Sequence, residues 1–304
     1  MTNDISSNKE FPVLAICYDF DKTLSPIDMQ AQGFIQSIGY DPGDFWRESD
    51  ELAQDNEMDK ILAYMYEMIS QSKKPFTLEY LKSLGLHLDL FPGVEEWFER
   101  VNAYGKKHHI TIEHYIISSG SKEMIEGTSI AHFFQKVYAS SFYFDKKGNA
   151  KWPAQVVNFT SKTQFLFRIE KGKLDINDEE VNTFFEPKDL KVPYRNMVYI
   201  GDSDTDIPCM KLVNSHGGHS IGVYNPQTCD KTKVYQMMED KRIGYFAEAD
   251  YSKGKALDRL IQAIIDKTER YEKLEKIHIA HLVESKEATQ DKLIHEAMDR
   301  LQKQ

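Results

Sequence analysis

Three short apolar runs in this chain each stop directly at a polar residue, and this arrangement constrains the fold more than any other feature. The runs are Val13–Tyr18, which stops at Asp19, His114–Ile117, which stops at Ser118, and Met197–Ile200, which stops at Gly201-Asp202. Runs that are apolar on both faces are typical of buried strands in a parallel sheet. Ligands of open α/β sheets bind beyond the carboxyl ends of the strands, so we expect these polar residues to meet at one edge.

Further strand-like and helical patterns alternate along the chain. Two more candidate strands lie at Ser220–Tyr224 and Tyr245–Ala247. Between the strands, helical spacing of apolar residues is found at Val94–Tyr104, Ser161–Ile169, Asp206–Val213 and Lys253–Ile265. This alternation predicts an α/β fold with a doubly wound, Rossmann-like parallel sheet.

Two regions depart from the alternation. Residues 26–88 contain no good buried strand, but apolar residues from Ile61 to Ile69 follow helical spacing, and Thr77 is a suitable N-cap for a following helix. We therefore predict a helical insertion over the strand ends. Residues 267–304 are highly charged and lack Gly and Pro, which predicts one or two helices packed on the core or on a second subunit.

These patterns divide the chain into three parts. Residues 1–25 and 89–266 form the predicted α/β core, residues 26–88 the helical insertion and residues 267–304 the helical tail. The tail is the segment through which we expect a homo-oligomer, if the chain forms one.

Composition excludes several classes of function. The 304 residues include 38 Lys and Arg against 48 Asp and Glu, a net charge of −10, whereas nucleic-acid binders usually present a basic face. The first eleven residues lack a basic segment followed by a long apolar stretch, and the run that follows is too short to span a membrane. Three scattered cysteines, Cys17, Cys209 and Cys229, are too few for a disulfide framework or a zinc site. We predict a soluble, cytoplasmic protein with no nucleic-acid or membrane partner.

Asp19 and Asp21 leave the end of the first strand together in the segment Asp19-Phe20-Asp21-Lys22-Thr23. Two carboxylates so close repel each other, and one takes up a proton unless a cation keeps both ionised. Mg²⁺ suits such a site because it prefers carboxylate oxygens and water.

Two further polar segments follow predicted strands. Gly201-Asp202-Ser203-Asp204-Thr205-Asp206 supplies more acidic ligands for the same cation, with Asp206 where the next helix should begin. Ser118-Ser119-Gly120-Ser121 offers hydroxyls and free backbone N–H groups at a helix start, which is a natural phosphate cradle. Each segment alone is also typical of an ordinary turn, but two carboxylate clusters at strand ends favour a site.

Taken together, these segments resemble the haloacid dehalogenase superfamily of phosphohydrolases. Asp19-x-Asp21-x-Thr23 matches the first motif of that family, Ser118 the second and Gly201-Asp202-x-x-x-Asp206 the fourth. The third motif is a single Lys, for which Lys162 is favoured because it opens a helical run, with Lys171 and Lys173 as alternatives. The insertion resembles a type 1 cap, and Phe142–Trp152 resembles the short hairpin of phosphoserine-phosphatase-like members.

The resemblance implies a mechanism and a set of site residues. Asp19 is the expected nucleophile, forming an aspartyl-phosphate, and Asp21 the expected general acid and base. Asp19, the backbone carbonyl of Asp21, and Asp202 with support from Asp206 are the expected Mg²⁺ ligands. Ser118 and Lys162 are expected to bind the phosphoryl oxygens, together with Thr23, Ser119 and Gly120 around them.

Asp21 favours phosphoryl chemistry over dehalogenation, because family members that cleave carbon–halogen bonds do not need an acid at this position. We therefore predict a Mg²⁺-dependent phosphomonoesterase acting on a small phosphorylated metabolite. The alternatives are a phosphomutase or other phosphotransferase of the same superfamily, and a regulatory protein that keeps the fold without turnover.

Overall fold

Seven strands form a single sheet in the order β4-β3-β2-β1-β5-β6-β7. All neighbouring pairs are parallel except β3 and β4, which confirms the predicted doubly wound α/β fold. The strands are β1 (Val13–Tyr18), β2 (Thr111–Ser121), β3 (Phe134–Phe144), β4 (Ala150–Gln155), β5 (Met197–Gly201), β6 (His219–Tyr224) and β7 (Tyr245–Glu248). This computed structural model describes the backbone of residues 11–302 and the side chains of residues 11–293. The predicted absence of a signal segment, which concerns residues 1–11, therefore falls almost entirely outside the described residues.

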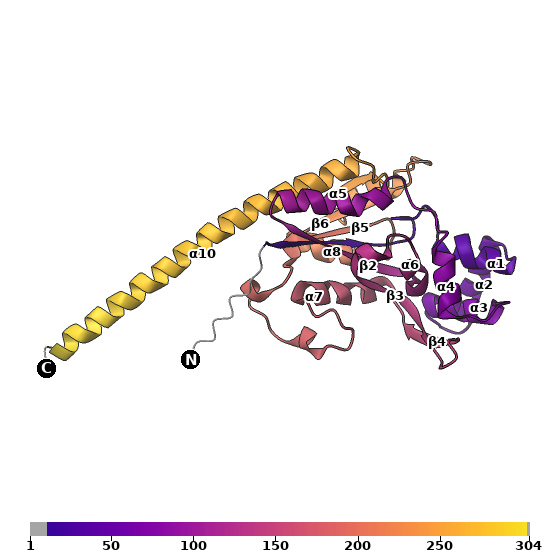
Figure 1. Cartoon of the computed structure of the whole chain (residues 1–304), viewed down its shortest axis with the longest axis horizontal. Helices are drawn as coiled ribbons and strands as arrows, with labels where there is room; N and C mark the ends of the chain where they lie inside the picture. The colour runs from indigo at the N-terminus through magenta and orange to yellow at the C-terminus, as the bar shows by residue number, and fades with distance from the viewer. Residues whose placement is uncertain (1–10, 303–304) are drawn as a thin grey trace.

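Helices cover both faces of the sheet (Figure 1). Ile16 and Tyr18 of β1 pack into one apolar cluster with Trp97, while Ala15 and Cys17 point to the other face. The first face is covered by α5 (Val94–Lys107), α6 (Lys122–Glu126) and the start of α10 (Ala256–Gln302). The second is covered by α7 (Thr163–Lys171), α8 (Ile207–Ser215) and α9 (Thr232–Glu239).

Short 3₁₀ helices fill the connections. They are η2 (Ala131–Phe133), η3 (Phe159–Lys162), η4 (Glu179–Asn182), η5 (Pro187–Asp189) and η6 (Tyr194–Asn196).

The strand β3 was missed from the sequence, which predicted only a hairpin at Phe142–Trp152. In the structure β3 begins at Phe134, runs parallel to β2, and then continues into the antiparallel hairpin with β4. Its sequence includes Gln135, Lys136 and Ser140, so it lacks the continuous apolar run that marks the other central strands.

Residues between β1 and α5 form helices at the carboxyl end of the sheet (Figure 1). They are the π-helix η1 (Ala31–Ile35) and the α-helices α1 (Gln36–Ile38), α2 (Pro42–Asp55), α3 (Lys60–Gln71) and α4 (Leu78–Gly85). The side chain of Thr77 accepts a hydrogen bond from the Tyr80 amide, the N-cap that the sequence predicts. A Cβ at Gly85 would collide with the Met124 carbonyl oxygen, so α4 lies directly against the backbone of α6.

The helix α10 joins two segments that the sequence separates. The predicted helix Lys253–Ile265, from Ala256 onward, and the tail from residue 267 form one helix of 47 residues, because neither Gly nor Pro interrupts it. Its first turns are buried, and Tyr104 and His108 of α5 hold it through Asp266 (2.9 Å) and Glu269 (2.9 Å).

Beyond these contacts α10 extends away from the core (Figure 1). Every residue from 276 to 293 is exposed, including Ile277, Leu282 and Leu293, and the side chains of Ile294 and Leu301 lie outside the described residues. Homo-oligomerisation through this segment stays a prediction. Across the described helices, none has both the length and the apolar character that a bilayer crossing requires.

Candidate active site

The three polar segments of the sequence meet at the carboxyl ends of the central strands. Asp19 directly follows β1, and its amide donates a hydrogen bond to the Ile200 carbonyl of β5 (2.9 Å). Ser118 belongs to β2 on the other side of β1, and Asp202 directly follows β5. Because β2, β1 and β5 are neighbours and parallel, their ends deliver these side chains to one place.

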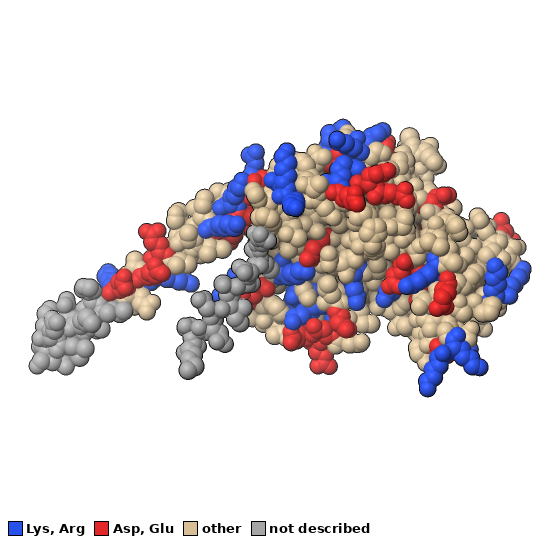
Figure 2. Space-filling model, in the orientation of Figure 1, with Lys and Arg blue, Asp and Glu red and all other residues tan. Residues whose placement is uncertain are grey.

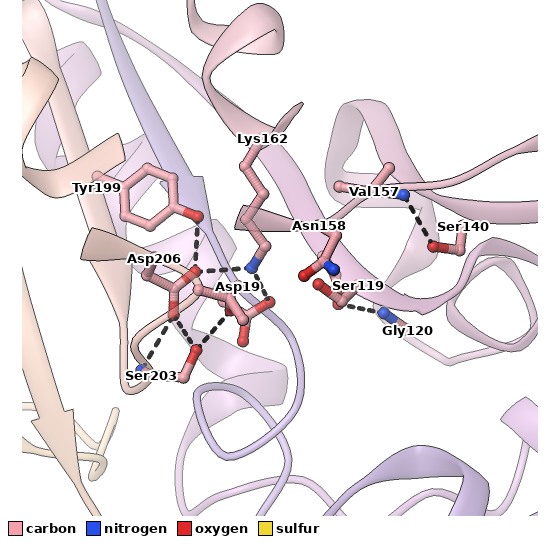
Figure 3. Close-up of polar contacts among 12 residues, drawn as sticks. Asp19, Ser119, Gly120, Ser140, Val157, Asn158, Lys162, Tyr199, Ser203 and Asp206 are labelled. Atoms are coloured by element: carbon pink, nitrogen blue, oxygen red, sulfur yellow. Dashed lines mark hydrogen bonds and ion pairs between the residues drawn. The ribbon is translucent and has the colours of Figure 1, made fainter. Parts of the chain in front are cut away.

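Lys162 lies at the centre of this place. It is the last residue of η3, it is fully buried, and its Nζ contacts Asp19 Oδ1 (3.0 Å) and Asp206 Oδ1 (2.7 Å), as Figure 3 shows. Burial by itself lowers the pKa of an ammonium, but the two carboxylates outweigh it and raise the pKa of Lys162. The ammonium is therefore held charged inside the protein.

The two alternative lysines lie elsewhere. The ammonium of Lys171 donates hydrogen bonds to the backbone carbonyls of Val181 (2.7 Å) and Thr183 (2.8 Å), and that of Lys173 pairs with Glu180. Both lysines hold the segment between α7 and β5. Among the three candidates, the structure brings only Lys162 to the carboxylates.

Asp206 is fixed through both of its carboxylate oxygens (Figure 3). Oδ1 accepts from Lys162 and from the hydroxyl of Tyr199 (2.8 Å). Oδ2 accepts from the amide (3.1 Å) and the hydroxyl (2.9 Å) of Ser203. Gly201 permits this packing, because a Cβ there would lie 2.6 Å from the carboxyl carbon of Asp206.

Three carboxylates gather around the lysine. Oxygen atoms of Asp19, Asp202 and Asp206 lie within 4.8 Å of one another. Burial, with further contributions from nearby carboxylates, raises the pKa of Asp19 to about 6 and that of Asp202 to about 8. If all three carboxylates are ionised, one ammonium leaves two negative charges without compensation, and a bound cation would balance them. This excess charge and the all-oxygen donor set fit a hard divalent cation such as Mg²⁺.

Asp21 lies beside this group, and its side chain is not one of the three clustered carboxylates. Its Oδ1 accepts a hydrogen bond from the Met29 amide (2.8 Å), and Lys22 after it has a positive φ of 58°, so the chain bends there. Burial first, and then the charges of Asp28 and Asp19, raise the pKa of Asp21 well above its usual value. The protonated form is thereby favoured.

The predicted phosphate-binding residues lie around the same strand ends. Ser118 is buried, and its hydroxyl accepts a hydrogen bond from the Gly120 amide (3.1 Å). The Ser119 hydroxyl is buried and has no hydrogen-bond partner among the described residues, while the Ser119 carbonyl accepts from Tyr64 of α3 (2.7 Å). Thr23 is completely buried and its carbonyl accepts from Tyr251 (2.8 Å), while its hydroxyl finds no partner in the part of the chain that the structure describes.

Sequence reasoning missed four residues of this site, namely Tyr199, Ser203, Tyr64 and Met29. Tyr199 lies two positions before Gly201, so the two residues share one face of β5. This alternation of strand residues could have identified Tyr199 from the sequence. Ser203 lies inside the acidic segment itself. Tyr64 and Met29 come from the insertion, and no local pattern indicates which insertion residues reach the strand ends.

Comparison with known proteins bears on this arrangement. The family model described as haloacid dehalogenase-like hydrolase matches residues 16–211, which is more than half of the chain. An uncharacterised protein of Borreliella burgdorferi is 29% identical over 283 residues, covering 82% of this chain and 95% of that protein.

Solved structures share the fold at low sequence identity. A HAD family hydrolase from Salmonella enterica subsp. enterica serovar Typhi is 15% identical with a TM-score of 0.53, covering 84% of this chain and 72% of that one. A probable phosphoserine phosphatase from Vibrio cholerae is 13% identical with a TM-score of 0.52, covering 87% of this chain and 69% of that one.

Proposed function

Since the chain belongs to the haloacid dehalogenase-like hydrolase family, we propose that it is a Mg²⁺-dependent phosphomonoesterase acting on a small phosphorylated metabolite. The observation that carries the proposal is the buried ammonium of Lys162 held between Asp19 and Asp206, with Asp202 alongside. A charged group is costly to bury, and this one lies where an anionic phosphoryl group would need it.

In the proposed reaction a carboxylate oxygen of Asp19 attacks phosphorus and forms an aspartyl-phosphate while the ester P–O bond breaks. Asp21 gives its proton to the departing alkoxide, which the raised pKa of its carboxyl supports. Asp21, now ionised, takes a proton from a water molecule that attacks the same phosphorus. This second step releases inorganic phosphate and restores Asp19.

The remaining residues bind and orient the phosphoryl group. In this proposal the Lys162 ammonium and the Ser118 hydroxyl, with Thr23 and the Ser119–Gly120 backbone nearby, contact its oxygens. Mg²⁺ bound by Asp19, Asp202 and the Asp21 carbonyl, with support from Asp206, would supply positive charge against that of the nucleophile and the phosphoryl oxygens.

Two finer points belong to the proposal. Phosphoserine is the first metabolite to test, because a probable phosphoserine phosphatase shares the fold. We also propose a cytoplasmic location, which three unpaired cysteines support because reduced thiols are usual there.

The test is release of inorganic phosphate from p-nitrophenyl phosphate and from a panel of phosphorylated metabolites, with Mg²⁺ and with EDTA. We expect turnover that requires Mg²⁺ and that falls at least about 1,000-fold in Asp19→Asn. Asp204→Asn is the matched control, because Asp204 lies in the same acidic segment as Asp202 but its side chain is 74% exposed. Among the described ion pairs it contacts only Lys233, at 3.8 Å. It should keep its activity within about threefold.

Full activity in Asp19→Asn would contradict the nucleophile assignment. Transfer of the phosphoryl group to an acceptor without release of phosphate would favour the phosphotransferase alternative. Inactivity of the wild-type chain against the whole panel would favour a regulatory protein that keeps the fold.

A further inference from the structure

Tyr64 lies on the buried face of α3, within the insertion. That face also carries Ala63, Met65 and Met68, whereas Figure 2 shows charged side chains on the outer surface of the insertion. The Tyr64 side chain is 4% exposed, so its hydroxyl is a polar group in apolar surroundings and needs a hydrogen-bond partner. Burial also raises the pKa of Tyr64, so the hydroxyl keeps its proton and remains a donor. It donates to the Ser119 carbonyl near the end of β2 (2.7 Å), 55 positions away in the sequence.

The Ser119 carbonyl belongs to the peptide group that joins Ser119 to Gly120. In a trans peptide the C=O and the N–H point in opposite directions. Tyr64 therefore holds one side of this peptide, while the Gly120 N–H on the other side donates to the Ser118 hydroxyl (3.1 Å). A hydrogen bond to the carbonyl also polarises the amide and strengthens its N–H as a donor. The Tyr64 hydroxyl thus sets the direction and the strength of an N–H donor in the expected phosphate cradle.

The same peptide lies against the expected acid. A Cβ at Gly120 would lie 2.9 Å from Asp21 Oδ2, so the backbone of Gly120 passes directly beside the Asp21 carboxyl. A displacement of this peptide would move the cradle N–H and would also change the surface against which Asp21 packs. The hydrogen bond from Tyr64 restrains that displacement.

A second contact holds α3 against the core. Asp59 is the N-cap of α3, and its Oδ1 accepts hydrogen bonds from the first amides of the helix. Its Oδ2 accepts from the side-chain amide of Asn158 (3.1 Å), which directly precedes η3, the 3₁₀ helix that ends at Lys162. The helix α3 therefore contacts both segments that carry the expected phosphate-binding groups, and Tyr64 reaches the cradle from a fixed position.

We propose that Tyr64 is a positioning residue, which holds the Ser119–Gly120 peptide from the insertion so that the Gly120 N–H faces the phosphoryl group. The inference rests on the proposed function, in which this segment contacts the phosphoryl oxygens. Tyr64 itself touches no reacting atom. Because preorganised N–H donors act on the charge that develops in the transition state, loss of the hydroxyl should lower kcat more than it raises KM.

The test compares Tyr64→Phe with Tyr80→Phe by steady-state phosphate release from p-nitrophenyl phosphate with Mg²⁺. Tyr80 is the matched control, because its hydroxyl lies 2.6 Å from the Ser37 hydroxyl and both residues belong to the insertion. We expect kcat to fall about tenfold in Tyr64→Phe, with KM changed by less than about threefold. Tyr80→Phe should keep both constants within about twofold.

An unchanged kcat in Tyr64→Phe would overturn the proposal, as would an equal fall in Tyr80→Phe, which would reflect a general loosening of the insertion. A rise in KM at unchanged kcat would also overturn it, because the hydroxyl would then serve substrate binding alone. Circular dichroism checks the fold of each variant, and Tyr64→Leu provides the same comparison if Tyr64→Phe does not fold. A wild-type chain that releases no phosphate with Mg²⁺ from p-nitrophenyl phosphate or from the metabolite panel would instead refute the proposed function itself, so the two failures are distinct.

Discussion

Two buried polar networks lie on either side of the junction between Tyr18 and Asp19, and they handle burial in opposite ways. The first, the charged network, contains one ammonium and two carboxylates joined by short contacts. It runs from Tyr199 through Asp206 and Lys162 to Asp19. Burial and the nearby charge of Asp206 raise the pKa of Asp19 to about 6, so the protein environment disfavours the ionised form of this carboxyl.

The second, the neutral network, contains no ionised group. The Trp97 indole donates to the Tyr18 hydroxyl (2.8 Å), which contacts His114 Nδ1 (3.0 Å), and His114 Nε2 contacts Asn102 Oδ1 (3.0 Å). Because the Tyr18 oxygen accepts from Trp97, its proton goes to Nδ1, and Nε2 carries the proton donated to Asn102. Burial lowers the pKa of His114 to about 3, so the imidazole stays neutral.

The difference separates structural burial from functional burial. In the neutral network, uncharged side chains are joined to one another by buried hydrogen bonds, and an arrangement of this kind stabilises a unique core. The charged network buries an ammonium together with carboxylates, and burial raises the pKa of Asp19 although Lys162 lies beside it. Such a site persists where it serves chemistry. Since Tyr18 and Asp19 are adjacent in sequence, a single position at the strand end separates the two kinds of site.

The largest expected effect comes from Lys162→Met, which keeps the side-chain length and removes the charge. Asp19 and Asp206 would then face each other buried and uncompensated, and breaking a buried pair costs about 3–5 kcal/mol in the free energy of unfolding. Urea unfolding in EDTA measures this loss. Phosphate release should fall below detection in the same variant.

The matched control is Lys171→Met, which removes a lysine nine residues away that binds backbone carbonyls and no carboxylate in the described contacts. It should cost about 0.5–1.5 kcal/mol, because the carbonyls that lose its hydrogen bonds are partly exposed and can bind water, and it should leave catalysis intact. Equal losses of stability and equal activities in the two variants would contradict the distinction between the networks.

The next effect concerns the neutral network and acid. The folded-state pKa of His114, about 3, lies below the unfolded value near 6.5, so the unfolded state binds the proton first. The stability contributed by neutral His114 is thus complete above about pH 6.5 and declines by about 1.4 kcal/mol per pH unit as pH falls toward 3. Urea unfolding of wild type and His114→Gln between pH 7 and 4.5 measures it.

The variant lacks the titrating imidazole, so the stability difference between wild type and His114→Gln should shrink by roughly 2–3 kcal/mol over this range. If the free energy of unfolding changed with pH in the same way for both proteins, His114 would take up its proton equally in the folded and unfolded states, which would contradict the prediction.

The two networks also show what could be predicted from the sequence. Asp19 and Asp202 were identifiable because each follows an apolar run, and Asp206 because it lies in the same acidic segment where the next helix begins. In the structure their oxygens lie within 4.8 Å of one another. Lys162 was favoured for its place at a helix start, and in the structure it contacts Asp19 and Asp206. Lys171 and Lys173 instead contact the segment between α7 and β5, which no local pattern indicated.

The remaining features depend on contacts between distant segments. Trp97 and Tyr18 are 79 positions apart, and Tyr64 and Ser119 are 55 apart, so no local pattern connects them. The strand β3 was missed because it contains polar residues, which are more typical of loops. The continuity of α10 was missed because its helical backbone continues beyond the residues with a regular apolar pattern. Local patterns locate strand ends, whereas packing decides which side chains meet there.

The smallest effect, and the sharpest comparison, comes from removing one buried hydroxyl in each network. Tyr18→Phe leaves the Trp97 indole and His114 Nδ1 without partners, which should cost about 1–3 kcal/mol of stability and leave kcat unchanged.

Tyr199→Phe removes a donor from Asp206, whose Oδ1 keeps Lys162, so its cost in stability should be smaller, about 1 kcal/mol. Because the loosened Asp206 positions Lys162 less firmly, kcat should fall about 5- to 20-fold with little change in KM. Urea unfolding should show the larger loss of stability in Tyr18→Phe, and steady-state kinetics should show the larger loss of kcat in Tyr199→Phe. If Tyr18→Phe lowered kcat as much as Tyr199→Phe, the neutral network would share the catalytic task, and the division at the Tyr18–Asp19 junction would be wrong.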